Sequence, residues 1–323
     1  MKLSSSRCML FLGRSGGGPA FAFSKFKTEF DKNSILICAK QNELIDIYKI
    51  AFGDQLRIIS MPSTMFEIKL YFIFEIFKIL KICWNSREVY ITAYHPILII
   101  LMPILKLIRV KIVYVLHDVV PHKKNYLENI IQYLLQKVSE KIIVLSKTQA
   151  DAYKKKYGKK PYLESHPPYL HYKYYKKTSK QVFSHVKFLF LGRIEEYKGL
   201  EFLSGLENTL PILCGKTILR IAGKGHLPNC LLNKPHIDVI NKYIQDKDIP
   251  SLIDACDYIV LPYKSATQSG LFGIADEFNK SILATPLEVF KDQSKEVKSC
   301  VYFSEHINKN SFLLLLKERY YAN

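Results

Sequence analysis

The sequence predicts an α/β protein built from two Rossmann-like domains. Three observations lead to this fold class: the length of 323 residues, the repeated alternation of short β-branched runs with stretches of helical length, and one interruption of that alternation near the middle. The length suits two domains of roughly 150 residues each better than one hydrophobic core. Alternating strands and helices favour parallel sheets that helices cover on both faces.

The composition is that of a folded, cytoplasmic protein. Apolar residues make up 48%, aromatic residues 13% and charged residues 24% of the chain, which is enough apolar surface to offset the entropy cost of folding. The seven cysteines are scattered and lack the spacing of zinc ligands, which favours reduced and mostly buried thiols. The apolar stretch at the N-terminus is too short for a signal peptide.

The expected strands fall into two groups. The first is residues 9–12, 35–38, 57–60, 88–92, 111–116 and 141–145, and the second is residues 187–192, 217–223, 236–240, 257–263 and 281–285. Between them, residues 165–180 hold two prolines and four lysines without apolar periodicity, which indicates a linker. We therefore expect a domain over residues 1–170, a linker over 171–185, a second domain over 186–306 and a final helix over 307–323 that packs back on the body.

Two apolar stretches are similar to membrane spans. Residues 66–82 carry five charged side chains, and residues 97–108 are short and contain Pro103 and Lys106. A membrane-spanning helix needs roughly 20 mainly apolar residues. Both stretches are therefore predicted to be buried helices.

The net charge of +18 is concentrated in the first half. Residues 1–172 hold 26 of the 47 basic side chains and 13 of the 29 acidic ones. Lys123, Lys124 and the lysines of residues 154–160 are interleaved with tyrosines, and each would contribute about 1 kcal/mol of attraction to an anionic membrane. The alternative is a solvated helix face.

Cations and glycines follow the expected strand 187–192. Gly192 ends the strand, Arg193 and Lys198 flank a loop, and Gly199 is expected to open a helix. Two cations, free N–H groups and the helix dipole would bind an anion, with roughly 1.5 to 3 kcal/mol from each charge-assisted hydrogen bond. The alternative is that both cations form surface salt bridges with Glu195, Glu196 or Glu201.

Two further strand ends have the same character. Residues 221–226, IAGKGH, contain glycines that would let a ligand approach the backbone. Residues 263–270 form a polar loop between a buried strand and a helix, an order that creates an anion cradle. The first turn of that helix is expected to hold Gln268, Ser269 and Gly270.

These segments resemble a known family. GRIEEYKG, IAGKG and LPYKSATQSG, in that order, are similar to the donor domain of GT-B glycosyltransferases of family 4, in a variant with an ATQSG donor loop. GRSGGGPAFAF is similar to the family's N-terminal glycine loop, VYVLHDVVPH to its HD segment, and IIVLSKTQADAYKKKYG with HPPY to the end of its acceptor domain. The resemblance implies two Rossmann-like domains facing a central cleft, the first for the acceptor and the second for the nucleotide sugar.

The resemblance also implies roles for individual residues. Arg193 and Lys198 would neutralise the leaving diphosphate in place of a divalent metal, so neither a metal nor a cofactor is expected. Further diphosphate contacts are expected from Gly16, Gly17, Ser269, Gly270 and Leu271. Contacts with the nucleotide or sugar are expected from Gly223, Lys224, Gly225, Thr267 and Gln268.

The donor loop departs from the family pattern of a Glu, seven residues and a second Glu. Thr267 or Gln268 falls near the first position, and Ala275 or Asp276 near the second. Glu277 is a further candidate for the second carboxylate. The departure affects the expected donor contacts more than the fold.

His117 and Asp118 are the candidate catalytic residues. They end the expected strand 111–116, at the carboxyl edge where open α/β sheets bind ligands. The resemblance implies that His117 positions the donor sugar or stabilises positive charge at its anomeric carbon, and Asp118 becomes a candidate base if the reaction inverts. A structural role is the alternative. His95 and His122 are expected at the same edge, with helix capping and loop packing as alternatives.

No metal site is expected. Asp246 and Asp248 spell the D-x-D that binds a metal in the other transferase fold. Asp248, however, precedes Ile249 and Pro250, so a helix N-cap explains it better.

The resemblance implies a hexosyltransferase of class EC 2.4. It would move a sugar from a nucleotide diphosphate sugar to a saccharide or polyprenyl-diphosphate-linked acceptor, with retention, in the synthesis of bacterial O-antigen, capsule or exopolysaccharide. The basic first domain would hold it peripherally on the inner face of the cell membrane. Two alternatives stay open: a nucleic-acid-binding protein, for which the chain lacks the usual motifs, and a GT-B relative such as a sugar-nucleotide epimerase.

Overall fold

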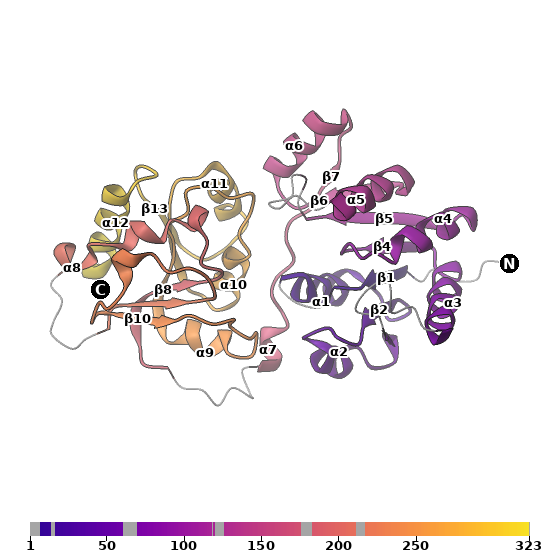
Figure 1. The fold of residues 1–323 in the computed structure, drawn as a ribbon, viewed down its shortest axis with the longest axis horizontal. Helices are drawn as coiled ribbons and strands as arrows, with labels where there is room; N and C mark the ends of the chain where they lie inside the picture. The colour runs from indigo at the N-terminus through magenta and orange to yellow at the C-terminus, as the bar shows by residue number, and fades with distance from the viewer. Residues whose placement is uncertain are drawn as a thin grey trace. The chain divides into compact units, whose positions relative to one another are not determined.

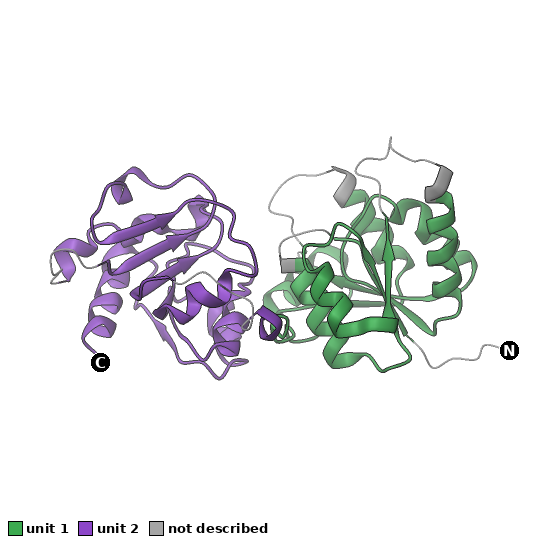
Figure 2. Cartoon of the chain, turned by 90° about the horizontal axis from the view of Figure 1, so that it is seen from below, with its two compact units in different colours: residues 1–171 green, residues 172–323 purple. Residues whose placement is uncertain are grey.

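The computed structural model describes residues 7–13, 17–60, 70–117, 119, 126–175, 183–210 and 217–322. The chain forms two compact units, residues 1–171 and 172–323 (Figure 2). Each unit contains one sheet of parallel strands. Five residues singled out in the sequence lie outside the described residues: Gly16, Asp118, His122, Lys123 and Lys124.

The first unit has a seven-stranded sheet in the order β3-β2-β1-β4-β5-β6-β7 (Figure 1). Its strands are β1 (Arg7–Phe11), β2 (Ile35–Ala39), β3 (Leu56–Ile59), β4 (Glu88–Ile91), β5 (Lys111–Leu116), β6 (Lys141–Val144) and β7 (Tyr162–Leu163). Its helices are α1 (Gly17–Glu29), α2 (Ile45–Phe52), α3 (Leu70–Trp84), α4 (Leu98–Leu107), α5 (Tyr126–Val138) and α6 (Lys147–Tyr157), with a 3-10 turn η1 (Gly53–Gln55). All six strands expected in this half are present, and β7 is an addition at the sheet edge.

Alternate residues of the central strands face two different layers, as the pleat of a strand requires. Cys8 and Leu10 of β1 belong to one core cluster with buried residues of α3, α4, α5 and α6. On α1 and α2, Phe23 lies 5.6 Å from Tyr48 and 4.9 Å from Phe52, measured between ring centroids. Helices α3, α4 and α5 therefore pack on the sheet face that Cys8 and Leu10 occupy.

One buried hydrogen bond ties α2 to the start of α1. The hydroxyl of Tyr48, which is fully buried, donates to the carbonyl oxygen of Pro19 at 2.6 Å. Tyr48→Phe would leave this carbonyl without its donor, so we expect a loss of about 1 to 1.5 kcal/mol in the free energy of unfolding by urea. Tyr162→Phe, at a side chain that is 58% exposed, is the matched control and should change it by less than about 0.5 kcal/mol. Equal effects of the two changes would contradict this role for Tyr48.

The second unit has a six-stranded sheet in the order β10-β9-β8-β11-β12-β13. Its strands are β8 (Val186–Leu191), β9 (Leu219–Ala222), β10 (Ile237–Ile240), β11 (Cys256–Leu261), β12 (Ser281–Ala284) and β13 (Val301–Phe303). Its helices are α7 (Tyr172–Tyr175), α8 (Leu206–Thr209), α9 (Ile249–Asp254), α10 (Leu271–Glu277), α11 (Glu288–Ser294) and α12 (Lys309–Tyr321), with 3-10 turns η3 (Glu196–Lys198), η4 (Leu200–Leu203) and η5 (Asn229–Leu231). The five expected strands are present, β13 is an addition, and the final helix α12 packs on η4 and α8 of its own unit.

Two expectations about helix starts are wrong. Gly199 does not open an α-helix but joins the 3-10 turns η3 and η4 with a φ of 62°. A side chain at this position would overlap the carbonyl oxygen of Pro262, so a close backbone contact explains the glycine. Gln268 and Ser269 precede α10 and do not form its first turn, because Gly270 is the N-cap.

The prediction of two buried helices is confirmed in part: both segments form helices with one side in the core, but neither helix is wholly buried. Phe74 and Phe77 of α3 are each 64% exposed, and Leu107 of α4 is 82% exposed. Each helix buries one side in the core and leaves large apolar side chains outside. None of the helices in the described ranges has the length and apolar character of a membrane span.

Candidate functional site

The site in the second unit lies where the strand order changes direction. From β8 the chain continues to β9 and β10 on one side, and then returns to β11 on the other side of β8. In open α/β sheets, ligands bind outside the carboxyl ends of the strands at such a switch point. Here the segments at this point are the loop after β8, residues 192–199, and the loop after β11, residues 262–270.

Lys198 joins these two loops. Its ammonium donates to the hydroxyl of Tyr263 and lies 4.1 Å from the centroid of that ring and 5.5 Å from the centroid of Tyr197. The backbone of Lys264 donates to the carbonyl oxygen of Tyr197 at 2.8 Å, which fixes the loops side by side. The two aromatic rings shield one side of the ammonium from water while their faces attract its charge.

This environment changes the chemistry of Lys198. Burial, together with the positive charge of Arg193, lowers the pKa of Lys198 to about 8, against the opposing effect of Glu195. A protonated amine that is partly removed from water has a strong preference for a nearby anion. Lys198 is therefore a partly desolvated cation that favours binding an anion, and it does not form a surface salt bridge.

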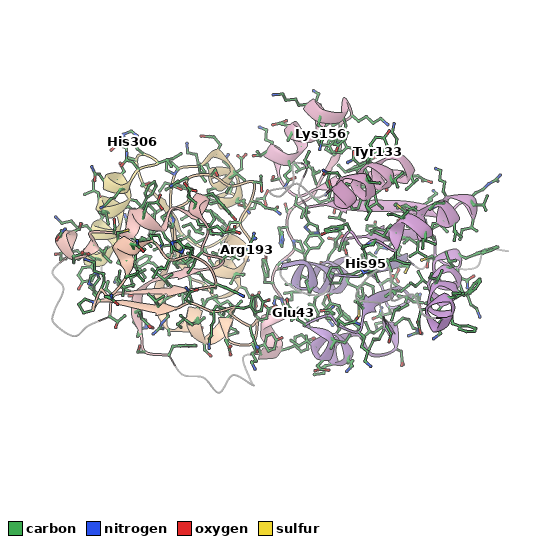
Figure 3. The ribbon with its side chains drawn as sticks, in the orientation of Figure 1. Glu43, His95, Tyr133, Lys156, Arg193 and His306 are labelled. Atoms are coloured by element: carbon green, nitrogen blue, oxygen red, sulfur yellow. The ribbon has the colours of Figure 1, made fainter. Side chains whose placement is uncertain are left out.

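The environment of Arg193 (Figure 3) differs from that of Lys198, although Arg193 is only five residues before Lys198 on the same loop. Its side chain is 65% exposed, and its guanidinium lies 3.0 Å from the carboxylate of Glu195. The alternative of a surface salt bridge therefore holds for Arg193. Exposed pairs of this kind contribute at most about 1 kcal/mol, so an arriving phosphate can replace Glu195 at little cost.

The IAGKG segment is bonded to the loop after β8. Gly192 donates its N–H to Ala222 at 3.0 Å, and Ile194 donates to Lys224 at 2.9 Å. Side chains at positions 223 and 225 would overlap the carbonyl oxygens of Gly192 and Ile194. These glycines therefore have a packing role between two loops, apart from any contact with a ligand.

The loop before α10 is held by one distant side chain. Gln293 accepts from the N–H of Ser269 at 2.9 Å and donates to the carbonyl oxygen of Ser269 at 3.1 Å. The N–H of Leu271 donates to the hydroxyl of Ser269 at 3.4 Å. Two of the three N–H groups expected to cap a phosphate thus have partners within the protein. Thr267 and Gln268 are half-buried in the same loop.

The candidate carboxylates of α10 serve local structure. Asp276 accepts from the N–H groups of Lys298 at 2.6 Å and Ser299 at 3.0 Å. Glu277 is the last residue of α10, at the opposite end from the donor loop, and pairs with Lys173 at 3.6 Å.

The D-x-D segment lies at a helix start, as predicted. Helix α9 begins at Ile249, with Pro250 in its first turn and Asp248 in the N-cap position. The carboxylate of Asp248 makes no capping hydrogen bond, however, so the position is right and the expected side-chain bond is absent.

In the first unit, His117 directly follows β5 as predicted. Its Nε2 atom lies 2.9 Å from the carbonyl oxygen of Thr92, an atom that only accepts, so Nε2 carries a proton. The side chain of Gln149 donates to the carbonyl oxygen of His117 and accepts from Val119 at 2.9 Å. His117 is thus held at the carboxyl edge of the sheet by β4 and α6.

A second histidine, which the sequence did not single out, lies beside His117. The ring of Phe21 on α1 packs edge-on against His117 at 4.6 Å and against His166 at 5.2 Å, between ring centroids. His166 stacks on Tyr169, and burial lowers the pKa of His166 to about 4, so His166 is neutral at physiological pH. The signal for it was the HPPY segment, whose first residue is His166.

Two further residues named in the sequence analysis, His95 and Gly17, lie at or next to helix starts in this unit. His95 accepts from the N–H of Ile97 at 3.3 Å just before α4, but Ile97 is the N-cap of that helix and α4 has no side-chain capping hydrogen bond, so this contact lies next to the helix start and does not cap it. Gly17 is the first residue of α1, directly after the undescribed residues 14–16.

Two residues of the second site, Gln293 and Asn241, carried no functional signal in the sequence, and a third, Tyr263, was indicated only as the first residue of the polar loop 263–270. Tyr263 contacts Lys198, Gln293 holds Ser269, and Asn241 bonds both the N–H and the carbonyl of Gly225, at 3.1 and 3.0 Å. Each partner is at least 16 residues away along the chain.

No protein-family model and no curated protein matches the chain. Solved structures do match over nearly its whole length. The structure of HepE from Anabaena in complex with UDP and glucose has a TM-score of 0.68 at 13% identity, covering 97% of this chain and 90% of that one. The chain has the GT-B fold.

Two further matching structures have the same two-domain fold, and one is a glycosyltransferase whereas the other is an epimerase. A glycosyltransferase from Rickettsia africae has a TM-score of 0.64 at 13% identity, covering 98% of this chain and 88% of that one. A UDP-GlcNAc 2-epimerase from Methanocaldococcus jannaschii has a TM-score of 0.57 at 12% identity, covering 97% and 92%. The GT-B fold therefore serves both transfer and isomerisation of sugars on nucleotides among these proteins.

Proposed function

We propose that this protein is a glycosyltransferase of the family 4 type that uses a nucleotide diphosphate sugar as donor. The observation that carries the proposal is Lys198, a partly desolvated ammonium at the switch point of the second sheet. A diphosphate supplies the anion that this environment favours. HepE, which shares the fold, was solved with UDP and glucose, and this supports the same class of donor.

The chemistry of transfer explains why cations are needed at this place. When the bond between the anomeric carbon and the diphosphate breaks, the leaving nucleoside diphosphate gains a negative charge. Lys198 and Arg193 would stabilise that charge as it develops, which lowers the barrier more than binding the donor alone does. In this proposal no metal takes part, and the N–H group of Gly270 and the glycine loop at Gly16 and Gly17 add contacts to the phosphates. The N–H groups of Ser269 and Leu271 would have to exchange their partners within the protein to do the same.

The remaining parts of the proposal rest on the family resemblance. His117 positions the donor sugar, Asp118 is a base only in an inverting reaction, and Thr267, Gln268 and the 223–225 turn contact the nucleotide or sugar. The transfer retains the anomeric configuration. The acceptor is a saccharide or a polyprenyl-diphosphate-linked saccharide, and the product belongs to bacterial surface polysaccharide.

A thermal-shift screen with UDP, GDP, ADP and CMP sugars tests the donor class. A ligand at 100 times its Kd stabilises the folded state by about 2.7 kcal/mol, which raises the unfolding temperature measurably. We expect one nucleotide series to do so at a concentration where the other series do not. No shift with any of the four would contradict the proposal.

Nucleotide affinity should depend on pH in the range where Lys198 titrates. Only the charged amine attracts a diphosphate, and its pKa is about 8 in the free protein. Raising the pH from 7 to 9.5 would therefore weaken UDP binding about 30-fold, whereas an ordinary lysine would change it by little more than about 10%. Calorimetric titrations at several pH values measure this. A flat profile over that range would show that Lys198 does not hold the diphosphate.

The epimerase match favours a second candidate function, the isomerisation of a sugar nucleotide. The two functions share the donor and differ in the fate of the sugar. A transferase releases nucleoside diphosphate in proportion to acceptor, whereas an epimerase converts the sugar with the diphosphate bond intact at equilibrium. Chromatography of the nucleotide pool, with and without an oligosaccharide acceptor, separates these outcomes.

A further inference from the structure

The outer surface of α3, α4 and α5 carries an unusual number of large apolar side chains. We call these side chains the α3–α5 face; they are Ile73, Phe74, Phe77 and Trp84 of α3, Ile100, Pro103 and Leu107 of α4, and Ile130 and Tyr133 of α5. All are exposed, and α4 contacts both of its neighbours. An apolar surface built from three helices is more than the scattered apolar residues of an ordinary surface.

Helix α4 shows the pattern most clearly. Its inner side is buried at Leu98, Leu101 and Leu105, as a core-facing helix requires. The opposite side presents Ile100, Pro103 and Leu107, spaced three and four residues apart, which is one stripe of an α-helix. The side of a helix that faces solvent usually carries charged and polar residues, but this side of α4 is an apolar stripe. The sequence of α4, LIILMPILKL, contains no carboxylate.

The aromatic members are of the kind that prefers a boundary between water and an apolar phase. Trp84, the only tryptophan of the chain, is 57% exposed at the end of α3. Tyr133 on α5 is 54% exposed (Figure 3). Tryptophan and tyrosine are enriched at membrane interfaces because one end of each is apolar and the other can bond to water.

Cations accompany the apolar residues on the same helices. Lys78 and Lys81 on α3, Lys106 on α4, Arg109 just after α4, and Lys137 on α5 are all exposed. Among the described side chains of these helices, Glu75 is the one carboxylate, and it is already paired with Lys78. Apolar side chains with a surplus of lysine and arginine around them are the signature of a surface that lies in an anionic bilayer interface.

We propose that the α3–α5 face inserts into the interface of an anionic membrane and is the surface by which this protein binds lipid. A second copy of the chain fits this face less well. A symmetric dimer would bring the same patch of each copy together and oppose the cations of one to the cations of the other. An anionic lipid surface complements both the apolar side chains and their positive neighbours.

This proposal differs from the expectation drawn from the sequence alone, which placed membrane contact on Lys123, Lys124 and the lysines of residues 154–160; Lys123 and Lys124 lie outside the described residues. Lys154 and Lys155 are exposed on α6, but Tyr153 of that helix is buried and its exposed residues are polar or charged. A helix of that kind attracts lipid head groups by charge without inserting. The two surfaces therefore predict different effects of salt and of mutation.

Trp84 provides a direct probe, because all tryptophan emission comes from this face. With vesicles rich in phosphatidylglycerol, we expect a blue shift of the emission and quenching by lipids brominated near the head-group end of the acyl chain. Leu107→Ser should weaken vesicle binding at least about tenfold, since burying a leucine side chain contributes about 1.5 to 3 kcal/mol. Its unfolding temperature should not change, because Leu107 is 82% exposed.

Ile50→Ser is the matched control. Ile50 is 74% exposed on α2, which does not belong to the core cluster of α3, α4 and α5. This variant should bind vesicles as the wild type does. A Lys154→Gln, Lys155→Gln double variant should keep the blue shift and lose only the salt-sensitive part of binding.

Three results would overturn the proposal. The first is vesicle binding without any change in Trp84 emission. The second is loss of binding in the α6 lysine variant but not in Leu107→Ser. The third is a dimer in analytical ultracentrifugation that Leu107→Ser dissociates, in the absence of any vesicle binding. None of these measurements requires a sugar nucleotide, so their outcome is independent of the proposed enzymatic activity.

Discussion

Replacing Lys198 by methionine is expected to weaken UDP binding at least about 100-fold while the protein keeps its fold. The change removes a charge-assisted hydrogen bond and the charge itself from the site, together about 3 kcal/mol of binding free energy. It should not destabilise the protein. Burial lowers the pKa of Lys198 to about 8, so at pH 7 the folded state holds a charge that it disfavours relative to the unfolded chain.

The sign of this stability effect follows from the same pKa. The unfavourable contribution of charged Lys198 is fully present below pH 8 and fades as the pH rises toward the ordinary lysine value near 10.5. Methionine has a similar length and no charge. At pH 7 the unfolding temperature of Lys198→Met should therefore equal or exceed that of the wild type, as differential scanning calorimetry would show.

Lys187→Met is the matched control for this experiment. Lys187 lies on β8, the strand before the Lys198 loop, and like Lys198 it is beside a tyrosine, 5.5 Å from the ring centroid of Tyr258; it pairs with Asp257 at 3.2 Å. It is located at the amino end of the strand, away from the switch point. This variant should bind UDP as the wild type does, and an equal loss in both variants would contradict a specific role for Lys198.

Gly223→Ala is expected to destabilise the second unit by about 3 kcal/mol, the second large effect. A Cβ at this position would lie 1.7 Å from the carbonyl oxygen of Gly192, so the two loops must move apart. Overpacking of this kind typically costs about 1 to 3 kcal/mol, and here the obstacle is backbone that cannot swing aside. The displaced loop carries Arg193 and Lys198, so UDP affinity should fall as well.

Gly205→Ala separates this clash from the general effect of replacing a glycine. Gly205 lies in the same unit with a φ of 82°, and its nearest neighbour would be the flexible end of Lys309 at 3.5 Å. We expect a loss of about 1 to 2 kcal/mol from backbone strain and no change in UDP affinity. Urea unfolding and calorimetric titration of both variants measure the two effects. If Gly223→Ala were no worse than Gly205→Ala, the close approach of the loops would be wrong.

The strands were largely predictable because a buried parallel strand needs a run of apolar residues. KIVYVL became β5 and KFLFLG became β8. The additions β7 and β13 could not be predicted in this way. Tyr162 and Leu163 of β7 are both exposed at a sheet edge, and the residues of β13 are only half-buried.

The order of the site's three loop motifs along the chain was predictable from the sequence. The contacts that surround Lys198 were less predictable. The three loops carry the motifs that the sequence indicated, and the structure brings the loop after β8 against the other two. The contact between Lys198 and Tyr263 spans 65 residues, so no local pattern contains it. The same limit explains the wrong prediction of a helix start at Gly199. A glycine is needed there because the carbonyl oxygen of Pro262, which is distant in the sequence, lies against it.

The apolar helices show a different limit of sequence patterns. Helix α4 is apolar on nearly all sides, and a helix of this kind is usually buried. Its composition cannot tell whether the outer apolar stripe faces protein or an apolar phase outside the chain. The exposed fraction of Leu107 shows that the described part of the chain does not cover this stripe.

A crystal structure of the protein with UDP would show whether Lys198 holds the diphosphate of a nucleotide sugar. We expect phosphate oxygens about 2.8 Å from the Lys198 ammonium, with the Arg193 guanidinium turned from Glu195 toward the phosphates. If UDP were bound elsewhere, with Lys198 still donating to Tyr263 and Arg193 still paired with Glu195, Lys198 would not be the residue that holds the diphosphate.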